Sequence, residues 1–501
     1  MAIANQYPRT VDNMSILEEI CSYCRTEGGS MWRLLCAGLL AVTPAPAPVP
    51  DIEDFLVERM HANQAPGLSY ALVHGDRVVR SGAWGTDGYG RPMTPHTPVG
   101  FGSVAKPVTA IAVLRLVDAG RIGLDDPVVR HLPWFRLADQ DAAREITVRH
   151  LLELTSGISA RDGYDRSDID DNAPGAIRRW VAGLADVTPA AAPGERHQYS
   201  PANAVIAGAL LEEVSGLSFS DYVRREVFAP LDMADGVADV HDAERMPPGH
   251  EFYFGGVRTA ARTFDMSGLP YGYLAGSATD LAHLAILQTD AGRFGDEQVL
   301  DPGTIAELQR GGPEAAGARY GLGWRVGTLD GTRIVWHAGA VTGYHSAVLT
   351  APDEGWAVAV QQNVYSPLHD EALNSAAFGA LTIALGGTPG PAPESSTTMV
   401  GLAGMGALAL TLAGGLVWTV WRFRRCATGR RAVLATAGWV ALGALSALAV
   451  GLWLPAAMDL RLRHIVRFMP DVGLLAIVVV VLGAALAVAR LATLVVELRR
   501  R

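Results

Sequence analysis

The sequence predicts an α/β fold of the α+β kind, in which one antiparallel sheet is built from both ends of a domain. Segments with β-rich composition lie near both ends of residues 51–385, and helix-forming segments lie between them. Three long apolar stretches follow that domain and predict three transmembrane helices. The mean hydropathy of the chain is +0.19, and the excess is concentrated in the C-terminal part.

The segment before the domain is predicted to be an extension and a signal-like leader. Residues 1–30 are polar and irregular, so we expect a disordered or non-native extension, with Met31 as the true start. Residues 31–50 contain one basic residue, an apolar run over 34–42 and small residues after it, as a signal peptide does. The run is too short to span a bilayer. A buried helix or a tethered leader are the alternatives.

Charge and cysteine content exclude several classes of site. The net charge of −10 argues against nucleic acid as a partner. Because no cysteine lies between residues 51 and 390, that region has no disulfide, thiol nucleophile or cysteine metal site. Cys21 and Cys24 form a lone C-x-x-C, which we interpret as incidental. No metal and no cofactor are expected.

The elements of the domain follow from local patterns. Strands over 68–74 and 77–81 flank the turn residues Gly75 and Asp76. Helices are predicted over 104–119, 176–184, 202–214 and 278–287, then strands over 333–336, 345–349 and 356–361, and a closing helix over 368–385.

A linker and a membrane anchor follow the domain. Residues 386–398 are rich in Gly, Pro and Ser and read as a linker. Transmembrane helices are predicted over 399–420, 432–454 and 472–489. Arginines gather between the first two and after the third, so the positive-inside rule places those groups in the cytoplasm and the domain outside. The segment between the second and third also carries charges: Arg461, Arg463, Arg467, Asp459 and Asp471.

Ser103-Val104-Ala105-Lys106 is the first candidate catalytic motif. It opens the apolar run from Val108 to Val117, and in a helix a residue three positions on lies on the same face. A lysine in a water-poor site loses part of its preference for the charged form and can take the proton of a serine hydroxyl. Alone, a Ser-x-x-Lys match is common by chance.

Two further motifs follow in the chain. Tyr199 lies in Tyr199-Ser200-Pro201, before an apolar helix, and is expected in a loop, where a phenol near a lysine can relay a proton. His337-Ala338-Gly339-Ala340 is predicted to follow directly after the strand 333–336. Gly339 would let a ligand approach the backbone closely. A tyrosine at the core edge and a histidine bonded to a carbonyl are the structural alternatives.

Together the three motifs resemble those of the serine β-lactamase and penicillin-binding-protein superfamily, closest to its class C β-lactamase-like branch. The resemblance spans nearly all of residues 51–385. It includes the stretches 66–68, 120–128, 146–158, 273–281 and 320–324, which are similar to stretches of that family. It implies a β-lactamase/transpeptidase-like fold.

The resemblance also implies roles. Ser103 would be the acylated nucleophile, and Lys106 its base or the group that keeps Tyr199 deprotonated. Tyr199 would pass the proton to the leaving group, and His337 would orient Tyr199 or a substrate carboxylate. The backbone N–H groups of Ser103 and Ala340, beside Gly339, would form an oxyanion hole. The implied partner is a small-molecule or peptidoglycan-peptide substrate, with the bilayer holding the helices.

The sequence departs from the family pattern at the second motif. Pro201 stands where the family has an asparagine that bonds the lysine, and Asn203 is two positions off register. Glu153 and Leu154 replace a small or polar residue and a histidine. The alternative to a membrane-anchored serine hydrolase is therefore an idle sensor or binding domain. A lipase lacks its G-x-S-x-G motif here, and a zinc lactamase lacks clustered His and Asp ligands.

Overall fold

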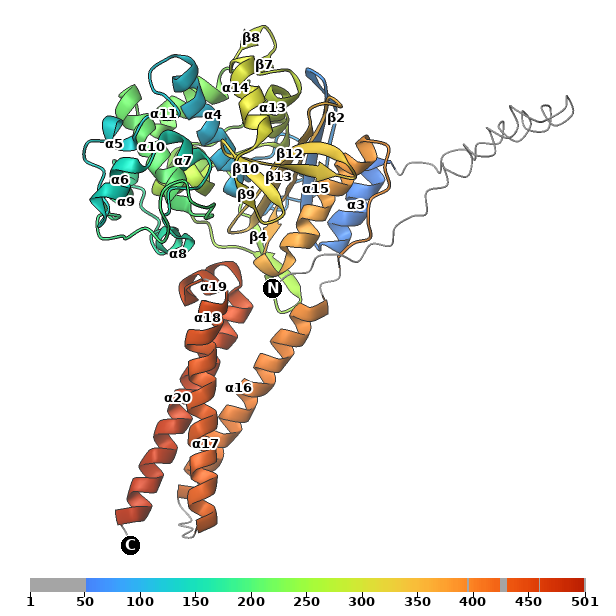
Figure 1. Cartoon of the computed structure of the whole chain (residues 1–501). Coiled ribbons are helices and arrows are strands. Elements are labelled where there is room, and N and C mark those ends of the chain that lie inside the picture. Colours follow the sequence, from blue (N-terminus) through green and yellow to red (C-terminus); the bar gives the residue numbers. More distant parts are fainter. Residues whose placement is uncertain (1–50, 394–395, 424–429, 459, 500–501) are drawn as a thin grey trace, which may run out of the picture. The chain divides into compact units, whose positions relative to one another are not determined.

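A computed structural model describes residues 51–393, 396–423, 430–458 and 460–499. The predicted extension 1–30 and the signal-like segment 31–50 lie outside these ranges, as does the C-x-x-C pair. Figure 1 gives the course of the chain and the element labels used below.

The domain is built around an eight-stranded sheet in which every neighbouring pair is antiparallel. β1, from the start of the domain, pairs with β14 from its end, and β2 extends the sheet beyond β1, so the sheet is built from both ends of the domain, as predicted. In spatial order the strands are β2 (Arg77–Gly85), β1 (Gly67–His74), β14 (Trp356–Gln362), β13 (Tyr344–Ala351), β12 (Thr332–Val341), β11 (Trp324–Leu329), β10 (Ala318–Gly321) and β9 (Glu314–Ala315).

Both faces of this sheet are buried, because alternate residues of its central strands join different cores. Tyr70 and Leu72 of β1 pack with the helices α3 (Ile52–Ala62) and α15 (Asp370–Ala384), which lie together beside the sheet (Figure 1). Ala71 and Val73 face the larger core, which contains the helical insert. The predicted closing helix is thus confirmed, two residues shorter at its start.

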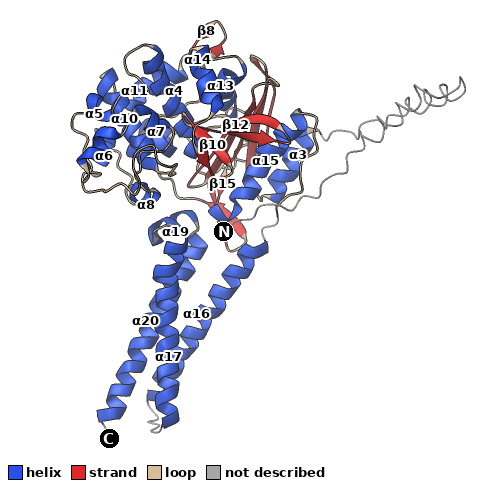
Figure 2. Cartoon of the chain, viewed as in Figure 1, coloured by secondary structure: helices blue, strands red, loops and turns tan. Residues whose placement is uncertain are grey.

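In the sequence the insert lies between β2 and β9, and Figure 2 shows its helices gathered beside the continuous sheet. The insert positions the first and second motifs. Its long helices are α4 (Ala105–Asp118), α10 (Pro201–Ser215) and α13 (Ala278–Thr289). Its shorter elements are α5 (Val128–His131), α6 (Gln140–Glu145), α7 (Val148–Leu152), α8 (Ala160–Tyr164), α9 (Ala176–Ala182), α11 (Phe219–Val223), η2 (Arg224–Phe228), α12 (Val240–Ala243), η3 (Met266–Gly268), η4 (Leu269–Tyr273) and α14 (Pro302–Arg310).

Small sheets and turns complete the domain. They are β3 (Val99–Gly100) with β6 (Ala275–Gly276), β7 (Arg293–Phe294) with β8 (Glu297–Gln298), β4 (His250–Tyr253) between β5 (Gly256–Thr259) and β15 (Val364–Tyr365), and the turns η1 (Gly102–Val104) and η5 (Pro367–His369).

The predicted ends of two strands are wrong. β2 continues to Gly85 rather than ending at residue 81. The third motif does not follow the strand 333–336 but lies inside β12, which continues to Val341. The strand continues because Gly339 and Ala340 still pair with Ser346 and His345 of β13. The small residues that suggested a strand end instead allow another backbone segment to pack against the strand.

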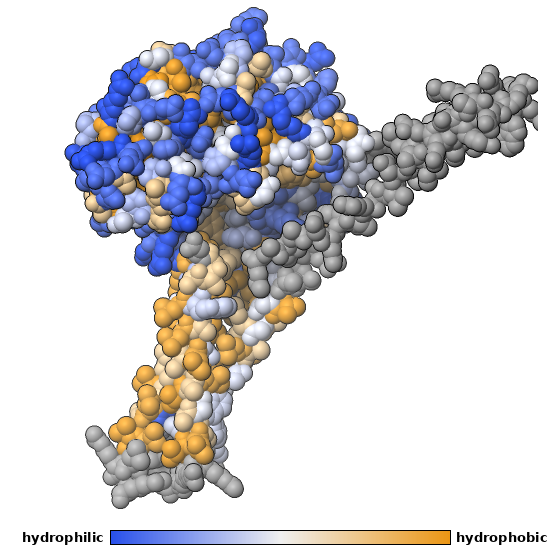
Figure 3. Space-filling view, in the orientation of Figure 1, coloured by the Kyte–Doolittle hydropathy of each residue, from blue (hydrophilic) through white to orange (hydrophobic). Residues whose placement is uncertain are grey.

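In the described part of the chain, three helices are long and apolar enough to cross a membrane, over 398–421, 433–457 and 470–496. They match the predicted helices 399–420, 432–454 and 472–489 within seven residues. They comprise α16 (Ser396–Phe423), α17 (Arg430–Leu448) with η6 (Ala449–Trp453) and α18 (Leu454–Ala457), and α20 (Pro470–Arg499). Figure 3 shows their apolar surface below the polar domain.

The place of one arginine differs from the sequence interpretation. Arg490, expected beyond the third helix, lies within its apolar span and is buried, with its guanidinium 4.6 Å from the ring centre of Trp418. The second and third helices approach closely at Gly443 and Gly483, where a Cβ on either residue would lie 2.5 Å from a carbonyl oxygen of the other. Small residues at such a crossing are typical of packed membrane helices.

Candidate active site

Ser103 lies in the short turn η1, immediately before α4. Gly102 precedes it with a φ of +52°, a conformation that favours glycine. Lys106 is in the first turn of α4, and its Nζ donates to Ser103 Oγ over 2.9 Å. The predicted pairing of these two side chains is therefore present in the structure.

Lys106 is buried, with 4% of its surface exposed, and has a second hydrogen-bond acceptor. Its Nζ donates to the carbonyl of Tyr271, in η4, over 3.0 Å. The same nitrogen lies 4.8 Å from the centre of the Tyr199 ring. Polar and aromatic partners thus surround an amine that burial alone would make costly.

The second motif is arranged around Pro201. Tyr199 precedes α10 in a loop, as predicted, and Pro201 occupies the start of the helix, where its missing N–H is not needed. Asn203 is fully buried and donates to the carbonyl of Ser200 over 3.2 Å. It therefore does not replace the expected asparagine, and the carbonyl of Tyr271 supplies the hydrogen bond to Lys106 instead.

Tyr199 is held by aromatic and cationic neighbours. Its ring meets that of Tyr320 edge-on at 6.4 Å, and Leu154 packs in the same small cluster. The guanidinium of Arg325, on β11, lies 5.8 Å from the Tyr199 ring centre. Arg325 also lines the cleft described below. The sequence analysis missed this arginine, because no motif marks it.

His337 lies on β12 and is bonded on both sides. Its Nδ1 is 2.7 Å from the carbonyl of Ala338, so this nitrogen carries the proton, and Nε2 accepts from the Tyr320 hydroxyl at 3.2 Å. Burial, reinforced by the charges of Lys106 and Arg325, holds the pKa of His337 well below its usual range. The ring is therefore neutral, and it reaches Tyr199 only through Tyr320.

The turn η1, which carries Ser103, and β12 meet backbone to backbone. A Cβ on Gly102 would lie 2.1 Å from the nitrogen of Ala340, and one on Gly339 would lie 2.4 Å from the nitrogen of Ser103. Both glycines are required by this close approach. It brings the predicted oxyanion-hole residues, Ser103 and Ala340, to the same place.

A buried polar network supports the turn from behind. The hydroxyl of Ser346 donates to the carbonyl of Gly100 over 2.9 Å, and the amide of Gln361 donates to Ser346 Oγ and to the carbonyl of Gly276. These side chains point from β13 and β14 into the sheet face that carries β3. They hold the strand that leads into the nucleophile turn, and no sequence motif indicated them.

A cleft of about 1000 Å³ contains the site. Its wall includes all the predicted residues, namely Ser103, Lys106, Tyr199, His337, Gly339 and Ala340. Within the described ranges no group of His, Cys, Asp or Glu side chains is arranged to hold a metal ion. The arrangement combines a hydroxyl, an adjacent amine, a phenol and two backbone N–H groups, which are the parts that acyl transfer through a serine needs.

Comparison with known proteins agrees with this geometry. Residues 52–380 match the family model described as Beta-lactamase. Penicillin-binding protein 4 of Amycolatopsis lactamdurans is 30% identical over 317 residues, covering 60% of this chain and 81% of that protein. An octameric penicillin-binding protein homologue from Pyrococcus abyssi superposes with a TM-score of 0.57 at 26% identity, over 68% of this chain and 78% of its own. A D-stereospecific amidohydrolase from Streptomyces sp. gives a TM-score of 0.52 at 25% identity, over 63% and 95%.

Proposed function

The chain belongs to the β-lactamase family, and we propose that it is a membrane-anchored serine hydrolase that works through an acyl-enzyme on Ser103. The observation that carries this proposal is the 2.9 Å hydrogen bond between Lys106 Nζ and Ser103 Oγ inside the cleft. A serine and a lysine with only structural roles would not be expected to bond to each other in the lining of a large cleft.

In the proposed acylation, Ser103 Oγ attacks the substrate carbonyl carbon while its proton passes to Lys106 or Tyr199. The N–H groups of Ser103 and Ala340 stabilise the negative oxygen that forms. The leaving group departs with a proton delivered by Tyr199. Water then attacks the acyl-enzyme, gives up a proton to the same groups and releases the acid, which restores the Ser103 hydroxyl.

We assign His337 a positioning role. Because the ring is neutral and accepts from the Tyr320 hydroxyl, it fixes the ring that packs edge-on against Tyr199. Arg325 is the group placed to attract a substrate carboxylate, since it is cationic and lines the cleft. The substrate class is a peptide or small acyl donor, in line with the penicillin-binding and amidohydrolase relatives.

The proposed location is the cell membrane, with the catalytic domain outside the cytoplasm. The three apolar helices support anchoring, and the arginine distribution supports the orientation.

The test is intact-protein mass spectrometry of the full-length protein in detergent, incubated with a fluorescent penicillin or with an activated ester. A stable mass increase or ester turnover that Ser103→Ala abolishes is expected. The lifetime of the adduct then separates a penicillin-binding protein from a fast hydrolase. A folded protein that neither gains mass nor turns over either compound would instead be a binding or sensor domain.

A further inference from the structure

We propose that α19 (Leu462–Phe468), between the second and third membrane helices, forms one wall of the substrate pocket and that His464 and Phe468 contact the acyl donor bound at Ser103. The occupant that we assign is an acyl donor with an amide group next to a large apolar group. The inference rests on the proposed function, because it names what the same site recognises.

The cleft that contains Ser103 is closed on one side by this segment. Met458, Leu460, His464 and Phe468 all line it. Two membrane crossings separate the end of the domain from this segment, so it lies on the same side of the bilayer as the domain in either orientation. The C-terminal part of the chain therefore supplies a wall of the site, through the segment between its second and third membrane helices, as well as an anchor.

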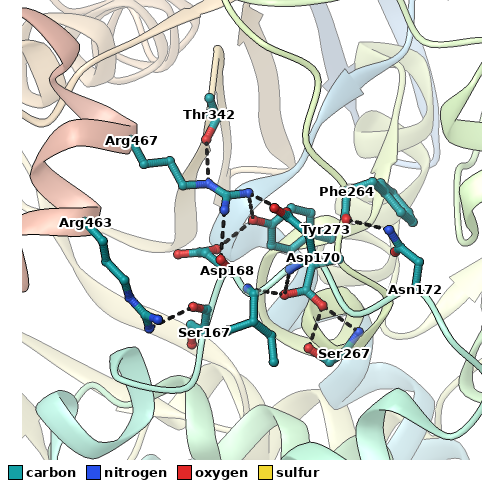
Figure 4. Close-up of polar contacts among 12 residues, drawn as sticks. Ser167, Asp168, Asp170, Asn172, Phe264, Ser267, Tyr273, Thr342, Arg463 and Arg467 are labelled. Atoms are coloured by element: carbon teal, nitrogen blue, oxygen red, sulfur yellow. Dashed lines mark hydrogen bonds and ion pairs between the residues drawn. The ribbon is translucent and has the colours of Figure 1, made fainter.

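α19 is attached to the domain by polar contacts, of which those of Arg467 with Asp168 and Tyr273 are partly buried (Figure 4). The guanidinium of Arg467, only 16% exposed, donates to the carbonyl of Asp168 over 2.8 Å and to the Tyr273 hydroxyl over 3.0 Å. It also pairs with the Asp170 carboxylate at 3.0 Å. A cation enclosed in this way holds the helix in one place.

Two more arginines hold the same loop of the domain. Arg461 forms an ion pair with the carboxylate of Asp165. Arg463 donates to the carbonyl of Asp165 over 2.6 Å and to that of Ser167 over 3.3 Å (Figure 4 shows the latter). The charges of the interhelical segment are thus matched by a complementary acidic loop rather than by lipid headgroups.

The loop that α19 holds is bonded to the catalytic lysine's own support. The backbone N–H of Asp168 donates to the Tyr271 hydroxyl over 3.0 Å, and the carbonyl of Tyr271 accepts from Lys106. Asp168 also accepts from the Tyr273 hydroxyl over 2.7 Å. The position of α19 is therefore linked to Lys106 through three hydrogen bonds, by way of Asp168 and Tyr271.

His464 has hydrogen-bonding capacity that the described residues do not use. The residue is 2% exposed, it lines the cleft, and neither ring nitrogen has a hydrogen-bond partner among the described residues. Its ring meets Tyr164 edge-on at 6.3 Å. Burial lowers the pKa of His464, so the ring is neutral and presents one donor and one acceptor. An amide can pair with one of them, through its N–H or its carbonyl, which removes the cost of one unpaired buried nitrogen.

The rest of the wall is apolar. Phe468 meets the ring of Tyr365 edge-on at 6.4 Å, and Met458 and Leu460 come directly after the apolar span that ends at Ala457. A group beside them lies next to the bilayer surface. The apolar group of the substrate can come from an amphiphile in the bilayer or from a soluble molecule, and both satisfy the same wall.

The test compares four p-nitrophenyl esters on the full-length protein in lipid nanodiscs. They are the esters of acetate, N-acetylalanine, N-phenylacetylalanine and N-decanoylalanine. The variants are His464→Phe, which keeps a ring but removes the nitrogens, and Phe468→Ala. The control is Val466→Ala, on the same helix, because Val466 is 39% exposed and packs near Gly473 of α20.

We expect His464→Phe to lower kcat/KM about tenfold for the three amide-containing esters and to leave the acetate unchanged. Phe468→Ala is expected to lower kcat/KM only for the phenylacetyl and decanoyl esters. Val466→Ala should match wild type throughout. If wild type prefers the decanoyl ester alone, the natural acyl donor is an amphiphile from the bilayer. If wild type uses the decanoyl and phenylacetyl esters equally, the natural acyl donor is a soluble molecule.

A binding measurement keeps this inference separate from the catalytic proposal. In the Ser103→Ala background, the dissociation constant of an uncleavable N-phenylacetylalanine amide should rise about tenfold on adding His464→Phe and stay constant on adding Val466→Ala. If wild type hydrolyses no ester, the proposed function fails, but this binding measurement still tests whether α19 forms a wall of the pocket. The proposed wall would be overturned by equal dissociation constants for Ser103→Ala alone, with His464→Phe and with Val466→Ala. It would also be overturned if the ratio of kcat/KM for the amide-containing esters to that for the acetate were the same in wild type and all variants.

Discussion

Lys106 joins the nucleophile to the rest of the site through single contacts: one to Ser103 Oγ, one to the carbonyl of Tyr271 and one to the face of Tyr199. We expect Lys106→Met to lower kcat/KM for an activated ester by about 10²–10⁴-fold, the usual contribution of a general base. Lys106→Arg should not restore it, because arginine stays charged. The check is the rate of Ser103 acylation beside thermal melting. A variant that melts like wild type and keeps most of its rate would contradict the role of the amine.

His197 gives a pH dependence of stability. Burial, with the charge of Arg325, lowers the pKa of His197 to about 4, whereas histidine in the unfolded chain takes up the proton near its usual pKa of 6.5. As pH falls from about 6.5 to about 4, the unfolded state binds a proton that the folded state excludes, so folding stability is lost over that window. Chemical denaturation at several pH values measures it.

We expect His197→Phe to flatten this part of the pH profile, whereas His61→Phe, at an exposed position, should leave it as in wild type. An unchanged slope in His197→Phe would mean that another group causes the loss. The ring of His197 lies 5.3 Å from that of Tyr320, with the two planes tilted by 45°, so a phenyl ring is the replacement that best preserves packing.

At the scale of elements, the contact between η1 and β12 has no room for a side chain. Gly339→Ala would place a Cβ 2.2 Å from the carbonyl oxygen of Phe101, so backbone must move. We expect a loss of acylation of at least tenfold and about 1–3 kcal/mol of stability, as for overpacked cores. Gly303→Ala in α14 is the matched control, since nothing lies within 4 Å of its added Cβ. Acylation kinetics and denaturation of both variants check this.

Sequence patterns predict those parts of the site that are local. Ser103 and Lys106 are three positions apart, so helical geometry alone brings them together. Tyr271 and Arg325 were missed because their contacts with Lys106 and Tyr199 join residues more than 100 positions apart. The end of β12 was misplaced because glycine and alanine have weak strand propensity, while pairing with β13 and contact with η1 decide the conformation.

At the scale of the whole molecule, two predictions are confirmed. They are the sheet built from both ends of the domain and the three long apolar helices. The docking of α19 was not predicted. Arg467 and its partner Asp170 lie 297 positions apart, and in the sequence the arginine reads only as a charge between two membrane helices. Such a contact depends on how the membrane helices meet the domain. The hydrophobic pattern of the sequence carries no information about that arrangement.

The proposed orientation makes a labelling prediction. Two single-cysteine variants are compared, with all other cysteines changed to serine. In the first, Asp296→Cys on the domain should react with a membrane-impermeant maleimide in intact spheroplasts. In the second, the native Cys426, between the first two spans, should react only after permeabilisation, because the neighbouring arginines favour the cytoplasm. Protection of Asp296→Cys together with labelling of Cys426 would show the reverse orientation.

The burial of Lys106 has a practical consequence. It is the only lysine among the 501 residues, and 4% of its surface is exposed. Apart from an N-terminal amine, the proposed catalytic amine is therefore the only primary amine that these residues offer to a reagent. Reductive methylation or acetylation of the native protein thus becomes a measure of how often the cleft opens, and a bound acyl donor should slow the reaction. Amine-coupled dyes, surface immobilisation and lysine-directed cross-linkers would either fail or block the proposed catalytic site.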